Sequence, residues 1–288
     1  MAVLSIQSHV VFGYAGNTAA VFPLQRLGRE VWAVNTVEFS NHTGYGAWKG
    51  KALGANLVSE LVSGIEERGA LIRCEAVLSG YLGDADIGSV IIDTVKKTRS
   101  ANPQAVYTCD PVMGDAGRGF YVKPDIPSVF REKLVPLADI VSPNQFELET
   151  LTETGIKNLD DAVKAVNILH EMGPSIVLVT SFREKINELS MIASDKKNMY
   201  IITTPELPLG NGAAGTGDIT SSVFLARYLE TRNLKKTLEL CAASVFGILE
   251  SSYKRADFSQ SGFPVELDII NAQQELVVPS NFFMAKEI

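Results

Sequence analysis

A glycine-rich run in the last third of the chain combines backbone donors with one carboxylate. The run is Leu209-Gly210-Asn211-Gly212-Ala213-Ala214-Gly215-Thr216-Gly217-Asp218, and a predicted helix begins at its end. Glycines ahead of a helix let several N–H groups point at one position, and the helix dipole adds positive potential there. Asp218 beside such a cradle could accept a proton from a substrate hydroxyl while the N–H groups hold a transferring phosphoryl group. On this segment alone, a helix N-cap explains Asp218 equally well.

Two other glycine patterns lack the context that their motifs require. Gly210, Gly212 and Gly215 have the GxGxxG spacing, but they follow a loop late in the chain, whereas the dinucleotide motif follows a first strand. Gly50-Lys51-Ala52 is similar to the end of a P-loop. Tyr45 stands where the first glycine is needed, and the Ala52 side chain cannot bind magnesium. The sequence therefore argues against both motifs.

Acidic residues follow two of the predicted strands. One segment is Cys109-Asp110-Pro111-Val112-Met113-Gly114-Asp115, and the other is Ser142-Pro143-Asn144-Gln145-Phe146-Glu147. Asp110 and Asp115 in a tight turn could position a hydrated magnesium ion, but an Asp-Pro turn with a solvated Asp115 is the simpler alternative. Glu147 could belong to a cation site near Asp110 or could be an acid favoured by a helix dipole, and locally the second explanation is the stronger.

Three loops in the N-terminal part offer hydroxyls, imidazoles and aromatic rings but little charge. They are Gln7-Ser8-His9-Val10, Phe39-Ser40-Asn41-His42-Thr43-Gly44-Tyr45 and Ser79-Gly80-Tyr81. This composition suits a flat, uncharged ring with polar edges better than a sugar. His9 and His42, each taken alone, are equally well explained as satisfied loop histidines.

The elements that must position these residues alternate along the chain. Short apolar runs predict strands at 2–7, 30–38, 75–79, 105–109, 138–142 and 176–180. Helices are predicted at 15–28, 56–68, 85–100, 126–135, 145–154, 160–172, 218–231, 235–253 and near 264–276. Residues 188–193 and 199–204 predict an antiparallel hairpin. The pattern predicts an α/β fold, a doubly wound, mostly parallel sheet with helices on both faces, in one domain over 1–288. Open sheets of this kind bind ligands beyond the carboxyl ends of their strands, where all the segments above lie.

Composition excludes several classes of protein. The 288 residues are 46% hydrophobic and 20% charged, with 26 Lys and Arg against 33 Asp and Glu, so the net charge is −7. This is a globular composition, and its acidity argues against nucleic-acid and membrane partners. The three cysteines are far apart, and the N-terminus has no basic region like that of a signal peptide. No apolar run reaches the roughly 18 residues of a membrane span. We therefore expect a cytoplasmic protein.

Taken together, the segments resemble the ribokinase-type superfamily and, within it, the pyridoxal kinase family. The matching segments run in order from residue 7 to residue 218: Gln7–Val10, Gly13–Asn17, Phe39–Tyr45, Ser79–Tyr81, Cys109–Asp115, Ser142–Glu147 and Gly215–Asp218. The last is specific only to the superfamily, whereas the first and third indicate the substrate class. The resemblance implies a ribokinase-like fold and ATP-dependent phosphorylation of the 5′-hydroxymethyl group of pyridoxal, in vitamin B6 salvage. Pyridoxine and pyridoxamine are often substrates as well.

The resemblance also implies roles for individual residues. Asp218 resembles the general base and a contact to the 5′-hydroxyl, and Gly215 and Gly217 resemble the anion hole. Substrate contacts are implied for Ser8, Thr43, Gly44 and Tyr81. The ATP site is implied to include Asp110, Asp115, Tyr121, Ser142, Glu147, Thr180, Gly215, Thr216 and Gly217. Asp110, Asp115 and Glu147 resemble residues near a divalent or monovalent cation, partly through water.

The family implies Mg²⁺ or another divalent ion such as Zn²⁺, with K⁺ as a monovalent activator. Thr180 stands where part of the family has lysine, which favours assistance by a monovalent cation. Members of the family are usually homodimers.

Three alternatives remain open. A hydroxymethylpyrimidine kinase has the same fold, but that family tends to carry cysteine where this chain has Asp218. A sugar kinase is disfavoured because the N-terminal third lacks an Asp/Asn-rich pattern. A non-catalytic protein that binds pyridoxal phosphate is disfavoured by the intact glycine run and by Asp218.

Overall fold

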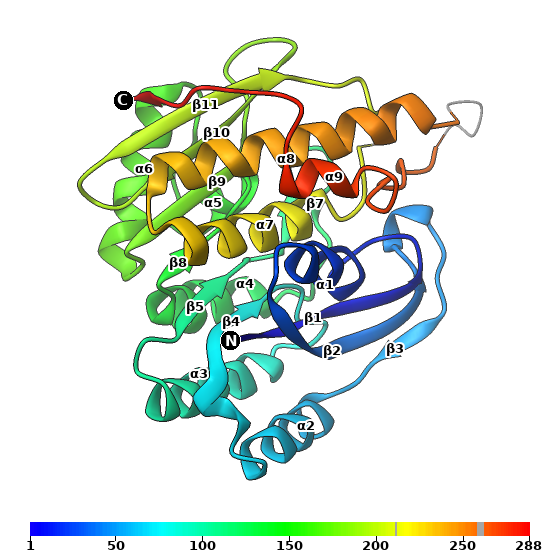
Figure 1. The fold of residues 1–288 in the computed structure, drawn as a ribbon, viewed down its shortest axis with the longest axis vertical. Helices are drawn as coiled ribbons and strands as arrows, with labels where there is room; N and C mark the ends of the chain where they lie inside the picture. The colour runs from blue at the N-terminus through cyan, green and yellow to red at the C-terminus, as the bar shows by residue number, and fades with distance from the viewer. Residues whose placement is uncertain (211, 258–261) are drawn as a thin grey trace.

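Parallel strands form the centre of a ten-stranded sheet in the computed structural model, which describes residues 1–210, 212–257 and 262–288 (Figure 1). The strand order is β12-β11-β10-β9-β8-β5-β4-β1-β2-β3. The parallel strands are β1 (Ala2–Phe12), β2 (Glu30–Asn41), β4 (Cys74–Ser79), β5 (Val106–Cys109), β8 (Ile140–Val141) and β9 (Ile176–Phe182). The mostly parallel, doubly wound sheet predicted from the alternation is therefore confirmed.

Antiparallel strands complete both edges of the sheet. They are β3 (Gly50–Ala52) beside β2, and β10 (Glu188–Ser194), β11 (Met199–Pro205) and β12 (Lys286–Glu287) beyond β9. The predicted hairpin at 188–204 is confirmed as β10 and β11. A separate small sheet pairs β6 (Gly114–Asp115) with β7 (Gly119–Phe120), and the sequence did not predict it.

Two layers of helices cover the sheet. Successive strand residues point to opposite faces, so Ala76 and Leu78 pack with one buried cluster and Val77 with the other. The first layer contains α1 (Asn17–Arg26), α7 (Thr216–Thr231), α8 (Leu234–Arg255) and α9 (Gln273–Val277). The second contains α2 (Ala55–Glu67), α3 (Ile87–Ala101), α4 (Ile126–Val129), α5 (Gln145–Thr152) and α6 (Leu159–Met172) (Figure 1).

Three predicted elements differ from the structure. Strand β1 continues to Phe12 because it pairs with β2 as far as Asn41. The predicted helix at 126–135 becomes α4, a π-helix η3 (Phe130–Leu134) and a 3₁₀ turn η4 (Val135–Leu137). The predicted helix at 264–276 was wrong over most of its length, since only Gln273–Val277 is α-helical. Val265 instead bonds through its N–H to the Gly212 carbonyl oxygen, which keeps that segment extended beside the glycine run.

The chain also contains two short 3₁₀ turns. One is η1 (Thr43–Tyr45), between β2 and β3, and the other is η2 (Ala70–Arg73), between α2 and β4. Among the described residues, no helix is long and apolar enough to cross a membrane. The three cysteines, Cys74, Cys109 and Cys241, are buried free thiols.

Candidate active site

The predicted site residues lie at the carboxyl ends of the parallel strands. Strands β1 and β4 are neighbours, but the chain leaves β1 towards β2 and leaves β4 towards β5. Ligands bind where strand order reverses in this way. Ser8 and Tyr81 flank this point, and Asp110, Ser142 and Thr180 follow along the same edge.

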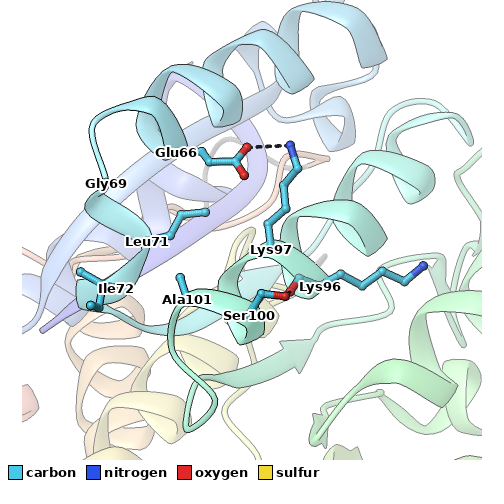
Figure 2. A pocket seen from close by; sticks show the side chains of 8 residues that line it. All are labelled: Glu66, Gly69, Leu71, Ile72, Lys96, Lys97, Ser100 and Ala101. Atoms are coloured by element: carbon cyan, nitrogen blue, oxygen red, sulfur yellow. Dashed lines mark hydrogen bonds and ion pairs between the residues drawn. The ribbon is translucent and has the colours of Figure 1, made fainter.

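Two surface hollows lie at opposite ends of the parallel strands. One hollow has a volume of about 490 Å³ and is lined by Glu66, Leu71, Ile72 and Lys97. Glu66 and Lys97 form an ion pair of 2.7 Å, drawn as a dashed line in Figure 2. This hollow lies between the end of α2, the turn before β4 and the last part of α3, at the amino ends of the strands, and none of the predicted site residues lines it. A second hollow of about 580 Å³ lies beside the site, between the end of β1, the glycine run and residues 262–268.

Asp218 lies in the first turn of α7 and is half-buried. The N-cap position belongs to Gly215, so the alternative of Asp218 as a simple N-cap is wrong. Burial raises the pKa of Asp218 to about 6, while hydrogen bonds from the backbone N–H groups of Gly16 and of Asp218 itself oppose the rise. The carboxylate is therefore mostly ionised at neutral pH and able to accept a proton.

Gly16 links Asp218 to Ser8. Its φ is 56°, and a Cβ at this position would lie 2.3 Å from Ser8 Oγ and 2.2 Å from the Ser8 carbonyl oxygen. Only glycine fits such a position. The substrate contact predicted on β1 and the predicted base on α7 therefore pack against the same residue.

The glycine cradle stands at the start of α7. Gly215 has a φ of 80°, and a Cβ there would lie 2.3 Å from the Tyr14 carbonyl oxygen. Above Gly217, no described atom lies within 4 Å of the position of a Cβ. The first N–H groups of a helix have no intrahelical partner, so those of Thr216 and Gly217 are available to an anion. Asn211 lies outside the described residues.

Asp110 and Glu147 form a buried acidic pair, exposed by 4% and 3%. Ser221 Oγ donates to Asp110 Oδ2 at 2.6 Å and lies 3.0 Å from Ser142 Oγ. Glu147 accepts from the N–H groups of Met113 and Asn144, both at 2.9 Å. Burial and the Asp218 charge raise the pKa of Asp110 to about 8, and burial and the Asp110 charge raise that of Glu147 well above its usual value.

This acidic pair suits a cation. Among the described residues, no Lys or Arg side chain forms an ion pair with either carboxylate. Glu147 also completes a capping box with Asn144, so the structural explanation of this residue is confirmed. Within the described chain, no group of three His, Cys, Asp or Glu side chains has the spacing of a metal site. Asp115 therefore does not complete a three-carboxylate centre.

Asp115 ends β6, and Tyr121 directly follows β7. Asp115 Oδ1 accepts from the N–H groups of Gly117 and Arg118 and so caps the hairpin turn. Tyr121 is 42% exposed as a residue, but desolvation of its hydroxyl and the charges of Glu147 and Asp110 raise the pKa of this phenol well above its usual value. The N–H of Tyr121 donates to the Met113 carbonyl oxygen at 3.1 Å.

Local contacts hold the residues that are predicted to bind the ring. His42 Nδ1 accepts from the Gly44 N–H at 3.1 Å, which fixes the turn that carries Thr43. Burial and the nearby Arg118 charge lower the pKa of His42, consistent with a neutral acceptor. Thr36 Oγ1 donates to the Tyr81 carbonyl oxygen at 2.7 Å.

His9, Thr180 and Ser221 also lie near the carboxyl ends of the parallel strands or beside Asp110. His9 Nδ1 lies 2.8 Å from Glu38 Oε2, so both loop histidines are satisfied within the protein. The Thr180 N–H donates to the Pro143 carbonyl oxygen at 2.9 Å, which places Thr180 beside Ser142. Ser221 was not predicted from the sequence, although its position three residues after Asp218 puts both residues on one helix face.

Comparisons with known proteins give one family model, and curated relatives and solved structures that cover nearly the whole chain. The sequence model of phosphomethylpyrimidine kinase matches residues 54–261. The chain is 48% identical to pyridoxal kinase PdxY of Rubrobacter xylanophilus, over 99% of this chain and 97% of the relative. It is 46% identical to pyridoxal kinase PdxY of Granulibacter bethesdensis, over 99% of each. Pyridoxal kinase from Leishmania donovani, in complex with ADP and pyridoxamine, superposes with a TM-score of 0.91 at 31% identity over 99% of each chain.

Proposed function

The chain belongs to the pyridoxal kinase family, and we propose that Asp218 is the general base when it transfers the γ-phosphoryl group of ATP to the hydroxymethyl oxygen of pyridoxal. It is an enzyme, a phosphotransferase with an alcohol acceptor, and ATP is its co-substrate. The observation that carries the proposed role is the position of Asp218. Its carboxylate lies at the glycine cradle and bonds to Gly16, which packs against Ser8.

In the proposed mechanism, the hydroxymethyl oxygen attacks the γ-phosphorus, and the bond from that phosphorus to the β–γ bridging oxygen breaks. The hydroxyl proton passes to Asp218, and ADP leaves with the bond electrons. The N–H groups of Gly215, Thr216 and Gly217 hold the phosphoryl oxygens as negative charge moves towards ADP. Ser8, Thr43 and the Gly44 turn hold the polar edge of the ring, with Tyr81 beside it.

We propose that Asp110, Glu147, Ser142 and Thr180 hold the cation and the phosphate chain, with Asp115 reached through water and Tyr121 closing over ATP. The support is the donor set, because carboxylate and hydroxyl oxygens suit Mg²⁺ and K⁺ and the buried acids lack a basic partner. A bound cation would neutralise the phosphate charge. Zn²⁺ could replace Mg²⁺.

Three coarser expectations also remain proposals. We propose that residues 1–288 form one kinase domain, which the continuous sheet supports. We propose a cytoplasmic location, which the buried free thiols support. We propose a homodimer with one site per subunit, on the pattern of the family, and sedimentation analysis tests it.

One assay tests the proposed function against its nearest rival. The match to phosphomethylpyrimidine kinase favours hydroxymethylpyrimidine as a second candidate substrate. ADP release is measured with pyridoxal, pyridoxine, pyridoxamine, hydroxymethylpyrimidine and ribose. We expect pyridoxal to give the highest kcat/KM among the ring types. A higher kcat/KM with hydroxymethylpyrimidine would favour a hydroxymethylpyrimidine kinase. If no acceptor led to ADP release, the protein would be a non-catalytic binding protein.

A further inference from the structure

The side chain of Glu266 joins two loops that are far apart in sequence, the turn after β1 that contains Tyr14 and the turn Thr43–Tyr45. We call them the substrate loops, because residues predicted to bind the ring lie on or next to them. Glu266 Oε2 accepts from the backbone N–H of Tyr14 at 3.1 Å, and Glu266 Oε1 accepts from the Tyr45 hydroxyl at 2.7 Å. Tyr14 belongs to the turn after β1, and Tyr45 ends the turn that carries Thr43. One carboxylate from the C-terminal segment therefore holds both loops.

The surroundings of Glu266 leave this arrangement little freedom. A Cβ on Gly13 would lie 2.3 Å from Glu266 Oε2, so only glycine leaves room for the carboxylate. The Tyr45 ring stacks on Phe263 at 5.1 Å and meets Phe12 edge-on at 6.0 Å. Burial and the hydrogen bond to Glu266 raise the pKa of Tyr45, so its hydroxyl remains a donor at neutral pH.

The segment that carries Glu266 is also fixed to the phosphoryl cradle. The N–H of Val265 donates to the Gly212 carbonyl oxygen at 2.9 Å. Two residues after Glu266, Asp268 accepts from Ser251 Oγ at 2.7 Å, and its N–H donates to Ser252 Oγ at 2.8 Å. Residues 265–268 are thus tied to the glycine run and to α8, whereas the Glu266 side chain is tied to the substrate loops.

These contacts link the turn predicted to bind the pyridoxal ring to Asp218, the proposed base. Tyr14 lies two residues before Gly16, whose backbone N–H donates a hydrogen bond to Asp218. The carbonyl oxygen of Tyr14 packs against Gly215. Tyr45 lies two residues after Thr43, the predicted ring contact. We propose that Glu266 is a positioning residue that sets the ring-binding turn relative to Asp218 and the cradle. This inference rests on the proposed function, since it assumes that these loops hold the phosphoryl acceptor.

The proposal predicts a specific loss in Glu266→Gln and in Tyr45→Phe. Hydrogen bonds to a charged group are stronger than neutral ones, so we expect kcat with pyridoxal to fall about tenfold in each variant. The KM for ATP, and any release of ADP measured without pyridoxal, should stay within about twofold of wild type, because the cradle itself is unchanged. The loss in the double variant should be smaller than the sum of the two single losses, because both substitutions affect the hydrogen bond between Tyr45 and Glu266.

Glu239→Gln is the matched control. Glu239 Oε1 accepts from the Ala285 N–H at 3.0 Å, so it also ties a C-terminal residue to the fold, but it contacts neither substrate loop. We expect this variant to keep wild-type kcat.

Three results would overturn the proposal. They are unchanged kcat with pyridoxal in Tyr45→Phe, additive losses in the double variant, and an equal fall of kcat and of pyridoxal-independent ADP release. Tyr45→Phe removes a single oxygen and so serves as the test if Glu266→Gln does not fold. The wild-type arm separates the two hypotheses, since wild type without activity on pyridoxal would contradict the proposed function itself.

Discussion

The hydroxyl of Ser221 donates to the carboxylate of Asp110, with Oγ 2.6 Å from Oδ2. Ser221 lies almost one helical turn after Asp218, so the helix that carries the proposed base also holds an acid at the end of β5. Asp110 in turn influences Glu147 through its charge. The three carboxyl groups therefore titrate as a linked set.

This linkage predicts that the ligand-free protein loses stability as the pH rises. The pKa of Asp110 is raised from 3.8 to about 8 and that of Asp218 from 3.8 to about 6, chiefly by burial. A carboxyl group with a higher pKa in the folded state binds more protons there, so its stabilisation is complete at low pH and is lost as pH rises through the folded pKa. We expect the free energy of unfolding in urea to fall from about pH 4 to pH 8.

Asp110→Asn tests how much of the fall in unfolding free energy at the higher pH values is due to Asp110. The variant should lose the decline between about pH 6 and pH 8, because the amide does not titrate. Parallel pH curves for wild type and variant would show that Asp110 is ionised at lower pH than its burial implies.

The hydroxyls of Ser8 and Thr43, which we propose bind the ring, should act mainly on substrate affinity. Ser8→Ala and Thr43→Ala each remove one hydrogen bond worth on the order of 1 kcal/mol, so the KM for pyridoxal should rise about fivefold. The KM for ATP serves as the internal control and should not change. If the KM for pyridoxal stayed at the wild-type value in both variants, the ring would bind elsewhere.

Cation dependence tests the acidic pair. We expect no activity without a divalent ion and higher activity with K⁺, since the site offers carboxylate and hydroxyl oxygens. Glu147→Gln removes one charge, so the K⁺ concentration for half-maximal activation should rise at least about tenfold.

Glu149→Gln is the control within the same helix. Glu149 accepts from the Ile156 N–H at 2.8 Å and should respond to K⁺ as wild type does. Full wild-type activity in buffer without Na⁺ and K⁺ would count against a monovalent site and leave Glu147 as the capping acid of α5.

The sequence predicted the elements whose residue patterns can be recognised locally. Buried parallel strands are apolar throughout, and the polar turn at 194–198 separates β10 from β11, so these features can be recognised locally. Strands β3, β6 and β7 have two or three residues, too few to show a period. The wrong helix at 264–276 followed apolar spacing, whereas the backbone there pairs with the glycine run.

Candidate site residues could be predicted where the residue type itself suggests the chemistry. Asp218 follows a glycine run, and Asp110 follows a strand, so both stand out in the sequence. Ser221 and Glu266 gain their roles from partners 111, 221 and 252 residues away, and no local pattern reports such contacts. Both became visible only when the fold brought the segments together.

The final prediction concerns Asp218, whose removal should affect the chemical step. The substrate hydroxyl is a poor nucleophile until its proton has an acceptor, and a well-placed base contributes about 10² to 10⁴ in rate. We therefore expect Asp218→Asn to lower kcat at least about a hundredfold. The ATP dissociation constant should change little, because asparagine keeps the size of the side chain and its oxygen can still accept from the Gly16 N–H.

Two measurements, kcat and the ATP dissociation constant, distinguish the roles open to Asp218. A loss of kcat with intact ATP binding assigns it to proton transfer, because binding and the cradle are then unaffected. Near-normal kcat would mean that phosphoryl positioning at Gly215–Gly217 suffices without a base. Loss of ATP binding together with a lower unfolding temperature would mean that the carboxylate mainly holds Gly16 against α7, since that hydrogen bond joins the β1 loop to the helix.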